Sequence, residues 1–563
     1  MSREKTNYWR IFRIVCAGIT FILFILVCFL PPVWSKAVVG QVLPSVLRST
    51  AYFYLAALVS VIIISLITLL IGRVYCSFIC PLGTLLDIFT WVFTLGRKKF
   101  RRLPSLRSLR YAILVGSVIF ALFGVMLPLG LIDPYSFFGR MVATMIQPVY
   151  IWADALLYRL SDGSYGMPLP QIAFSHYVFV ITLIMLVLLA ATAVWRGRIF
   201  CNSVCPVGTY LSFLARFSLF KIQLKGPACP GCTKCEAVCK AGCIHLHRQR
   251  IDFSRCVMCL NCIESCVISS IKMKVARRYR HSKEISEHFS LHEPAGTGLS
   301  DNVSYQKRHP HKREKVHHLS ETEHESSMHS HLSNQELLRR RHHRFPEMID
   351  FSRREFLISV GSTGIAAAVA APLLKLTAAG RSPVMPPGAV DRDRFISRCT
   401  SCHLCISHCP SKVIKSAALQ YGPAGLMLPY LDYGNRMCEF ECNICSNVCP
   451  TGALIPLSLK KKQLTRIGLV KYYFDRCIVP RQMTSCGACA EHCPTGALEM
   501  KKWRKGLRIP TVHPEYCIGC GACQKICPAL PDKAVVVSGL SRHEKAQEHV
   551  TIKAEAVSDG FPF

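Results

Sequence analysis

Four groups of four cysteines lie between residues 399 and 527, and their spacing is nearly constant. In the first and last groups the cysteines are separated by two, two and three residues and are followed by proline. The second and third groups widen only the first gap. This spacing is typical of [4Fe–4S] clusters, in which three thiolates bind one cube and the fourth binds the neighbouring cube. Zinc ribbons instead use two CxxC pairs, so we favour iron–sulfur clusters over zinc or a disulfide scaffold.

Crossing of the fourth ligand gives each predicted cluster a set of four cysteines. The sets are Cys399, Cys402, Cys405 and Cys449; Cys438, Cys442, Cys445 and Cys409; Cys477, Cys486, Cys489 and Cys527; and Cys517, Cys520, Cys523 and Cys493. The first group also matches the CxxCH pattern of haem attachment, with His403 as its last residue. Because Cys405 and Cys409 continue the cluster spacing, we interpret His403 as a loop residue.

A second cysteine block, nearer the N-terminus, repeats the same spacing. The two predicted sets are Cys229, Cys232, Cys235 and Cys266, and Cys256, Cys259, Cys262 and Cys239. The trailing prolines are missing, since Lys240 and Val267 follow the fourth cysteines. Cys243 is a fifth cysteine with no assigned role, and it competes with Cys239 as a candidate ligand. This block is interpreted as a two-cluster ferredoxin.

Long apolar runs place the first part of the chain in a membrane. The predicted spans are Tyr8–Trp34, Ala51–Gly72, Leu109–Leu131 and Phe174–Trp195, each long enough to cross about 30 Å of hydrocarbon. Basic residues cluster after the second span, from Arg97 to Arg110, and Arg196 and Arg198 follow the fourth. The positive-inside rule therefore places these loops and the N-terminus in the cytoplasm. The segment Leu85–Leu95 is too short to span and is expected along the interface.

The same phrase follows the second and the fourth span. It is CxxxCPxG, with Cys76, Cys80 and Gly83 in one copy and Cys201, Cys205 and Gly208 in the other. On a helix, residues four apart share one side, so each pair of thiols would point the same way. One interpretation is a redox-active or metal-binding thiol pair near the depth of the quinone. The other is a packed, reduced pair at a helix turn, and the sequence leaves both open.

Three residues near the opposite membrane boundary are weak candidates for a quinol site. Asp133 and Arg140 lie in the loop after the third span, and His176 begins the fourth. A carboxylate at this depth could take protons from a quinol. His176 has the alternative role of an ordinary interfacial histidine. Since no other histidine lies in the four spans, a haem b with two axial histidines is not expected.

A polar linker and a second apolar segment separate the two cysteine blocks. Residues 309–343 are rich in histidine, serine and charge, a composition that cannot bury enough surface to fold alone. Then Ser352-Arg353-Arg354-Glu355-Phe356-Leu357 precedes a weakly apolar stretch from Ile358 to Leu376. This is typical of a twin-arginine signal, which exports cargo that has folded around its cofactors. The sequence does not decide between cleavage and retention as a fifth span.

Composition agrees with a multi-domain membrane protein rather than a nucleic-acid binder. The chain has 563 residues, of which 51% are hydrophobic, and a formal net charge of +34. Many of its cations flank apolar helices, and six oxidised clusters would carry roughly twelve negative charges. The predicted fold is an α-helical membrane domain with α+β ferredoxin-like domains. The predicted domains are residues 1–220 (four spans), 221–276 (two clusters), 277–348 (disordered linker), 349–380 (twin-arginine signal or anchor), 381–540 (four clusters) and 541–563 (polar tail).

Both halves of the chain resemble known membrane-associated ferredoxins. The four spans, the CxxxCPxG pair and the two-cluster block resemble the NapH/MauN type. The part from Ser352 onward resembles the NapG/MauM type, through its twin-arginine signal and four clusters, Cys449-Pro-Thr-Gly-Ala-Leu454, Arg466-Ile-Gly-Leu469, the long gap between Cys477 and Cys486, and Pro510-Thr-Val-His513. The resemblance implies electron transfer from menaquinol to a periplasmic acceptor such as nitrate reductase. The two types are usually separate proteins, and here they look fused.

We therefore expect an inner-membrane protein that passes electrons from a quinol through six [4Fe–4S] clusters to a periplasmic reductase or cytochrome. It has no signature of a terminal substrate site of its own. The first cysteine block would lie in the cytoplasm and the last domain in the periplasm. Because electrons do not tunnel usefully across the full membrane, a quinone or the CxxxCP thiols must bridge the two. The alternative function is an assembly factor for a metalloenzyme, with the histidine tract handling metal.

Overall fold

The structure is a computed structural model of the 563-residue chain. It describes residues 2–29, 40–52, 55–93, 107–161, 175–224, 232–246, 250–266, 270–275, 353–376 and 382–548. Met1–Val275 and Phe351–Phe563 form one compact unit, which contains the apolar helices and both cysteine blocks. The predicted histidine-rich linker and the polar tail from residue 549 on lie outside the described residues.

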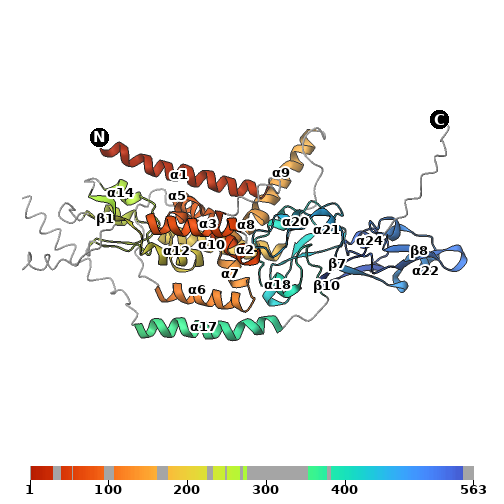
Figure 1. Ribbon diagram of the computed structural model, residues 1–563. Helices are drawn as coiled ribbons and strands as arrows, with labels where there is room; N and C mark the ends of the chain where they lie inside the picture. The colour runs from red at the N-terminus through yellow and green to blue at the C-terminus, as the bar shows by residue number, and fades with distance from the viewer. Residues whose placement is uncertain are drawn as a thin grey trace, which may run out of the picture. The chain divides into compact units, whose positions relative to one another are not determined.

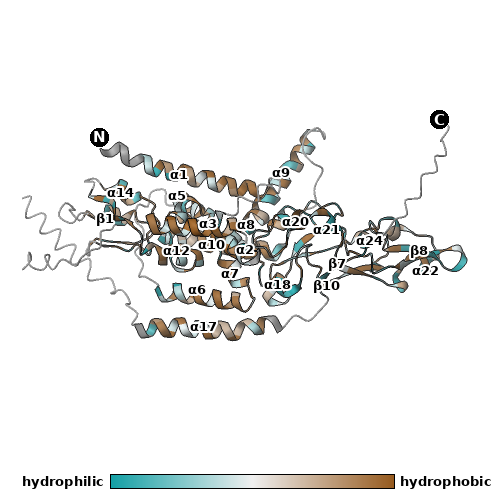
Figure 2. Ribbon diagram, in the orientation of Figure 1, coloured by the Kyte–Doolittle hydropathy of each residue, from teal (hydrophilic) through white to brown (hydrophobic). Residues whose placement is uncertain are grey.

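The N-terminal part is helical. Its elements are α1 (Ser2–Val27), α2 (Val42–Tyr52), α3 (Leu55–Ile71), α4 (Tyr75–Phe78), α5 (Pro81–Phe93), α6 (Arg107–Leu122), α7 (Leu127–Ile132), α8 (Pro134–Met141), the π-helix η2 (Val142–Ile146), α9 (Gln147–Leu160), α10 (His176–Arg196), α11 (Ile199–Ser203) and α12 (Pro206–Ala215). Apolar side chains dominate α3 and α10 (Figure 2). Many of them are exposed on the protein surface, as expected for helices that face lipid.

Three helices are long and apolar enough to cross a membrane: Tyr8–Val27 in α1, His176–Arg196, and Glu355–Leu374 in α17 (Arg353–Leu376). The second predicted span is shorter, because α3 has 17 residues and rises only about 26 Å. The third predicted span is interrupted. α6 ends at Leu122, Gly124 takes a positive φ of 76°, and a separate helix, α7, follows. The count of four spans plus one therefore stays a prediction.

The helix α17, which begins at Arg353 within the twin-arginine motif, lies along α6 (Figure 1). Small residues allow the close approach. A Cβ added at Gly364 would lie 3.2 Å from Ile119, and one added at Gly116 would lie 3.2 Å from Thr363. Tyr111 and Phe356 pack edge to face at one end of the pair, with ring centroids 5.7 Å apart. Glycine and threonine at the contact are typical of helix pairs in membranes.

The first cysteine block is built from short elements around its cysteines. They are β1 (Phe220–Leu224), α13 (Lys234–Ala237), β2 (Ile244–His245), β3 (Arg250–Ile251), α14 (Asn261–Ser265) and β4 (Ile271–Val275). β1 pairs antiparallel with β4, with Phe220 opposite Val275, and β2 pairs with β3. This is the predicted mixture of helix and strand in a ferredoxin-like unit.

The second block is built in the same way, from short helices and antiparallel strand pairs. Its helices are α18 (Arg392–Ile396), α19 (Leu404–Ser407), η4 (Pro423–Gly425), α20 (Ile444–Asn447), α21 (Leu459–Gln463), η5 (Phe474–Arg476), α22 (Ile478–Gln482), α23 (Ala488–Glu491), η6 (Arg504–Gly506) and α24 (Ala522–Ile526). Its strands are β5 (Ile414–Ser416), β6 (Pro429–Leu431), β7 (Thr465–Tyr472), β8 (Leu498–Lys502), β9 (Arg508–Val512) and β10 (Val535–Lys545). They form the antiparallel pairs β5–β6, β7–β10 and β8–β9.

One continuous group of packed, buried residues joins the first cysteine block to the second. It contains Cys256 and its neighbours, the four CxxxCP thiols, Tyr75 and Tyr135. Cys402 and Cys405, from the first group of the second block, pack against the same core. The helical body is therefore in direct contact with both cysteine blocks.

Candidate metal centres and the helices between them

Two cavities in the last domain are each lined by four cysteines. One is lined by Cys477, Cys486, Cys489 and Cys527, with Pro510 and Val535 among its other walls. The other is lined by Cys493, Cys517, Cys520 and Cys523. In both, three cysteines come from one group and the fourth comes from the other. These are the crossed sets that the spacing predicts, and their thiols and apolar walls suit an iron–sulfur cube.

The other two sets of this domain also come together. The Cys405 thiol interacts electrostatically with those of Cys399, Cys402 and Cys449. The Cys445 thiol interacts in the same way with those of Cys438, Cys442 and Cys409. Each set again combines three cysteines of one group with the fourth of the other.

Contacts between the sets arrange them in a row. Cys405 is within electrostatic range of Cys445 in the second set. The backbone N–H of Cys438 then donates to the carbonyl of Cys520, 2.8 Å away, which ties the second set to the Cys517 set. The Cys517 and Cys477 sets are neighbours because each takes its fourth cysteine, Cys493 or Cys527, from the other's group. The order from the helical body outward is therefore the Cys399, Cys438, Cys517 and Cys477 sets.

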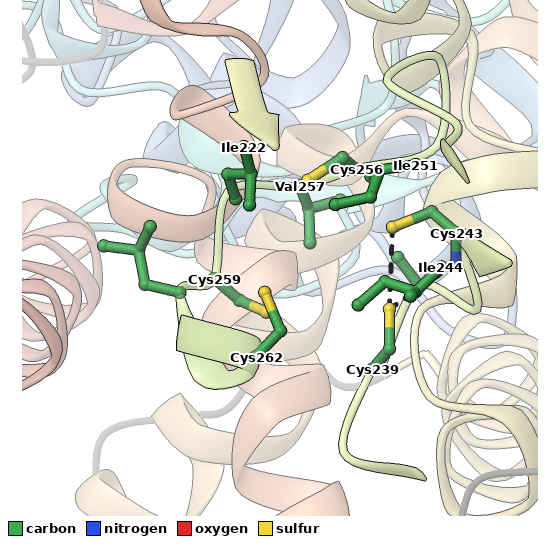
Figure 3. Close-up of a pocket in the computed structure, with 11 residues that line it drawn as sticks. Ile222, Cys239, Cys243, Ile244, Ile251, Cys256, Val257, Cys259 and Cys262 are labelled. Carbon is green, nitrogen blue, oxygen red and sulfur yellow. Dashed lines mark hydrogen bonds between the residues drawn. The ribbon is translucent and has the colours of Figure 1, made fainter. Parts of the chain in front are cut away.

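In the first cysteine block, a cavity is lined by Cys239, Cys256, Cys259 and Cys262, again a crossed set (Figure 3). The other predicted set is described only in part, because Cys229 lies outside the described residues. Cys232 is exposed and Cys235 is buried.

Cys243 lines the same cavity as a fifth thiol. Its sulfur lies 3.5 Å from that of Cys239, and Figure 3 shows the two side chains facing each other. The hydrogen bond lowers the pKa of Cys239 and raises that of Cys243. These opposite pKa directions favour Cys239 as the thiolate ligand and Cys243 as its hydrogen-bond donor.

The two CxxxCPxG motifs lie at the N-termini of two equivalent helices. Cys80 and Cys205 precede α5 and α12, and a proline occupies the first turn of each helix. The Cys205 sulfur accepts a hydrogen bond of 3.2 Å from the N–H of Gly208. Proline fits the first helical position because its missing N–H would have no partner there. The motif is therefore a cysteine-capped helix N-terminus, made twice.

Each copy is held by an arginine from the other copy. Arg73 donates to the carbonyl of Cys201 at 2.9 Å, and Arg198 donates to the carbonyl of Cys76 at 2.7 Å. Gly83 and Gly208 make room for this exchange. A Cβ on either would lie 2.3 Å from the first cysteine's carbonyl and within 3.0 Å of the incoming guanidinium.

The sequence analysis did not predict this role of the two arginines. Gly72-Arg73 and Gly197-Arg198 stand at equivalent places before the two phrases, so the repeat is GRxxCxxxCPxG. Both glycines have positive φ, 100° and 64°, which favours glycine. Extending the alignment of the two copies by three residues would have found them.

Asp133 and Arg140 are brought together against the first cluster loop of the second block. Arg140 is 1% exposed and donates to the carbonyl of Gly130 at 2.9 Å. Longer contacts of 3.4 and 3.3 Å join it to the carbonyls of Thr400 and Ser401. A Cβ on Gly130 would lie 2.6 Å from the Thr400 carbonyl, so the two backbones are nearly in contact.

The Asp133 carboxyl caps α8 and is buried. One oxygen accepts bonds of 2.8 Å from the N–H and the hydroxyl of Ser136. The other oxygen is buried and has no hydrogen-bond partner. Burial raises the pKa of Asp133 to about 6, although Ser136 and Arg140 act against it. His176, by contrast, is exposed at the start of α10 and is not part of this buried group.

His403 is held within its own domain. It is 2% exposed, and its Nε2 lies 3.0 Å from the Met427 carbonyl and 3.2 Å from the Ser416 hydroxyl. Burial lowers the pKa of His403 to about 3. The ring is therefore neutral and bonded to the backbone, in keeping with a loop residue.

Comparison with known proteins relates this chain to iron–sulfur proteins. A family model described as a 4Fe-4S dicluster domain matches residues 484–530, and one described as a 4Fe-4S binding domain matches residues 53–102 and 177–225. The ferredoxin-type protein NapG of Escherichia coli is 35% identical over 203 residues, which are 34% of this chain and 86% of that protein. The chain belongs to the NapG family of ferredoxin-type proteins.

Two further relatives are less similar. The electron transport protein YccM of Escherichia coli is 27% identical over 242 residues, 41% of this chain and 57% of its own length. The methylamine utilization ferredoxin-type protein MauN of Paracoccus denitrificans is 27% identical over 186 residues, 32% of this chain and 54% of its own length. The chain thus spans a little over half of these two relatives. No solved structure matches it.

As a ferredoxin-type protein, this chain is an iron–sulfur electron-transfer protein with [4Fe–4S] domains. Within the described residues, no three His, Cys, Asp or Glu side chains converge on the position of a single metal ion.

Proposed function

We propose that this ferredoxin-type protein oxidises a quinol in the inner membrane and delivers the electrons through a row of [4Fe–4S] clusters to a periplasmic redox partner. The observation that supports it is the contact between the Asp133–Arg140 segment and the loop of the Cys399 set. A candidate proton acceptor thereby stands next to the first candidate electron acceptor. When bound, the clusters supply one-electron carriers.

Asp133 has the properties of a proton acceptor for quinol oxidation. Each quinol molecule loses two protons and two electrons, so the protons need an acceptor where the electrons leave. One Asp133 oxygen has no hydrogen-bond partner, and a pKa of about 6 lets the group bind and release a proton near neutral pH. Ser136 orients the carboxyl through its hydroxyl.

Arg140 acts as a positioning residue in this proposal. It joins carbonyls of the helical body to carbonyls of the cluster loop, and so fixes the distance between Asp133 and the Cys399 set. Its guanidinium also places a positive charge beside thiolates, which favours electron arrival there. The rest of the row then leads the electrons toward the Cys477 set.

The proposed topology places this row on the periplasmic side. The twin-arginine motif lies at the start of α17, whose segment Glu355–Leu374 is long and apolar enough to span, and α17 packs on α6. We propose that α17 is retained as an anchor, and that the first cysteine block faces the cytoplasm. The six predicted clusters would then be divided between the two faces.

The test is anaerobic reconstitution of the full chain in liposomes with a soluble menaquinol analogue, followed by stopped-flow absorbance and electron paramagnetic resonance. The outer clusters should become reduced within seconds. The Asp133→Asn variant should be about 100-fold slower, since general-base catalysis contributes at least this much. Reduction by dithionite but not by the quinol would overturn the proposal.

The pH profile sharpens this test. Because the acceptor must be deprotonated, the wild-type rate should rise as the pH increases through about 6, and the variant should lose this step. The groups facing Asp133 are Arg140, Tyr75, Tyr135 and the predicted cluster ligand Cys402. Burial raises the pKa of both tyrosines well above the ordinary value and lowers that of Arg140 only to about 10, so none of these three groups titrates near pH 6. Asp154→Asn on α9 makes the same chemical change elsewhere and should keep the wild-type profile.

A further inference from the structure

Four buried thiols belong to none of the six predicted cluster sets. They are Cys76, Cys80, Cys201 and Cys205, and each is at most 6% exposed. The Cys205 thiol is within electrostatic range of the other three, and the Cys80 thiol is within range of Cys76 and Cys201. The two copies of the repeat therefore bring their thiols to one place.

The spacing of these thiols differs from that of a bonded pair. No disulfide and no sulfur–sulfur hydrogen bond joins any two of the four, all of which the structure describes. Cys239 and Cys243, in contrast, have sulfurs in contact at 3.5 Å. All four thiols are therefore free to act as ligands.

The buried arginines around the thiols favour a negatively charged group at this site. Arg73 is fully buried, makes no ion pair among the described residues, and leaves its Nε without a hydrogen-bond partner. Its Nη2 lies 3.7 Å from the Cys76 sulfur. Arg198, also buried, shares the single carboxylate of Asp87 with Arg13 and Lys240. Buried cations are costly unless they are paired, so negative charge is expected at the thiols.

The helix starts supply further stabilisation for thiolates. Cys80 and Cys205 cap α5 and α12, helices of 13 and 10 residues, where the amide groups and the helix dipole favour negative charge. The Gly208 N–H already points at the Cys205 sulfur. The proline and glycine of each phrase are thus explained by ligand geometry as well as by packing.

Neither repeat has enough ligands for a cluster alone. The matches to the family model described as a 4Fe-4S binding domain cover residues 53–102 and 177–225, and each contains two cysteines. We propose that Cys76, Cys80, Cys201 and Cys205 bind one iron–sulfur cluster, shared between the two repeats. Binding would release the four thiol protons and leave about two negative charges, which Arg73 and Arg198 offset.

This centre would lie between the two cysteine blocks. Arg73 also donates to the carbonyl of Ser254, two residues before Cys256, and Ser77 donates to the carbonyl of Val257. On the other side, Tyr75 interacts electrostatically with both Cys80 and Asp133. The inference deepens the proposed function, because it adds a carrier inside the helical body. It does not require that the electron donor be a quinol.

The test is an iron and sulfide count on the full-length protein, purified without oxygen. The Cys80→Ala, Cys205→Ala double variant should lose about four iron atoms per chain for a cube, or about two for a [2Fe–2S] centre, with equal sulfide. Cys16→Ala, which removes an α1 thiol outside the site, should lose none. Membrane insertion and the paramagnetic signals of the remaining clusters show that the variant has folded.

A double variant that inserts, keeps its other clusters and holds wild-type iron would overturn the proposal. If the double variant fails to insert, Cys205→Ser keeps a donor atom of similar size. It should then shift the Mössbauer and paramagnetic signals of one centre, and an unchanged spectrum would overturn the proposal. Neither measurement uses quinol, so failure of the quinol test leaves this result independent.

Discussion

At the scale of single residues, the hydrogen bonds and burial of a thiol or carboxyl decide whether it carries a proton. Cys239 and Cys243 line one cavity with their sulfurs 3.5 Å apart, and this contact lowers the pKa of Cys239 and raises that of Cys243. Hydrogen bonds to ligand sulfurs are one of the means by which proteins set cluster potentials. Asp133 similarly acquires its proton affinity from burial, which no reading of its neighbours in the chain could show.

Cys243→Ala should lower the reduction potential of the inner cluster without loss of iron. The hydrogen bond stabilises the more negative, reduced state, and a contribution of about 1 kcal/mol corresponds to about 40 mV for one electron. A redox titration followed by electron paramagnetic resonance measures the shift. Loss of the cluster in this variant, but not in Cys239→Ala, would instead identify Cys243 as the ligand.

Asp87→Asn should destabilise the helical body strongly. Arg13, Arg198 and Lys240 all lie within 3.0 Å of this carboxylate, which retains 18% exposure. Burial alone would raise the pKa of Asp87, but these cations outweigh burial and hold it below the ordinary value. Removing the only shared partner should cost on the order of 3 kcal/mol, measured as a lower melting temperature in detergent.

The same argument fixes the direction of the pH dependence. Because the folded-state pKa of Asp87 is lowered, its ionised form contributes stability above the ordinary carboxyl range, and this contribution is lost as the pH falls through the lowered pKa. Asp87→Glu retains the charge and should keep most of the stability. Equal melting temperatures for the Asn and Glu variants would contradict this account.

At the scale of elements, small residues set how closely helices approach. The contact between α6 and α17 uses Gly116, Thr363 and Gly364, and the exchange between the two repeats uses Gly83 and Gly208. A Cβ at Gly83 or Gly208 would meet a backbone carbonyl, which cannot easily move, whereas a Cβ at Gly116 or Gly364 would meet a side-chain methyl group at 3.2 Å. Pairing of two membrane helices depends on such contacts, because lipid and helix surface are equally apolar.

Gly364→Leu should separate α17 from α6. The added side chain would enter space already bounded by Ile119 and Val115, at 3.2 and 3.7 Å from the Cβ position. Gly361→Leu is the matched control on the same helix, since nothing lies within 4 Å of its Cβ position. Photo-crosslinking to α17 from a benzophenone residue in place of Tyr111 should fall several-fold in the first variant only.

Gly83→Ala should disturb the thiol site, whereas Gly18→Ala should not. The Cβ at position 83 would lie 2.3 Å from the Cys76 carbonyl and 2.8 Å from Arg198, while Gly18 has open space around it. The variant should therefore lose the Arg198 contact and melt at a lower temperature, by several degrees. Iron content and melting curves of both variants, measured side by side, provide the comparison.

At the scale of the whole molecule, the order of the cysteine sets suggests a direction for electrons. The Cys399 set touches the helical body, and the Cys477 set is last in the row. The first cysteine block contacts the same helical body, through hydrogen bonds from Arg73 and Ser77 of the first GRxxCxxxCPxG repeat. A single path can therefore pass from one block to the other through packed protein.

Cys477→Ser should remove the last cluster and leave the first ones reducible. With quinol as donor, the signals of the Cys399 and Cys438 sets should still appear. Electron delivery to an added periplasmic cytochrome should fall at least tenfold, because the remaining tunnelling distance is longer. Normal delivery by this variant would mean that electrons leave from an earlier set, and the order of the row would then not describe the path.

The sequence by itself determined the chemistry of the chain and most of its local structure. The cysteines of each group lie within a short stretch of the chain, so their spacing was enough to indicate the cluster groups. The CxxxCPxG motif is equally short, and its two copies indicated two related helix N-termini. What only the tertiary structure decided are contacts between distant segments. Arg73 with Cys201, Arg140 with Thr400 and Cys243 with Cys239 depend on how elements pack, and apolar length alone could not show that α6 ends at Leu122. Spacing along the chain fixes which groups a loop can offer, whereas burial and charge pairing arise only when separate elements meet.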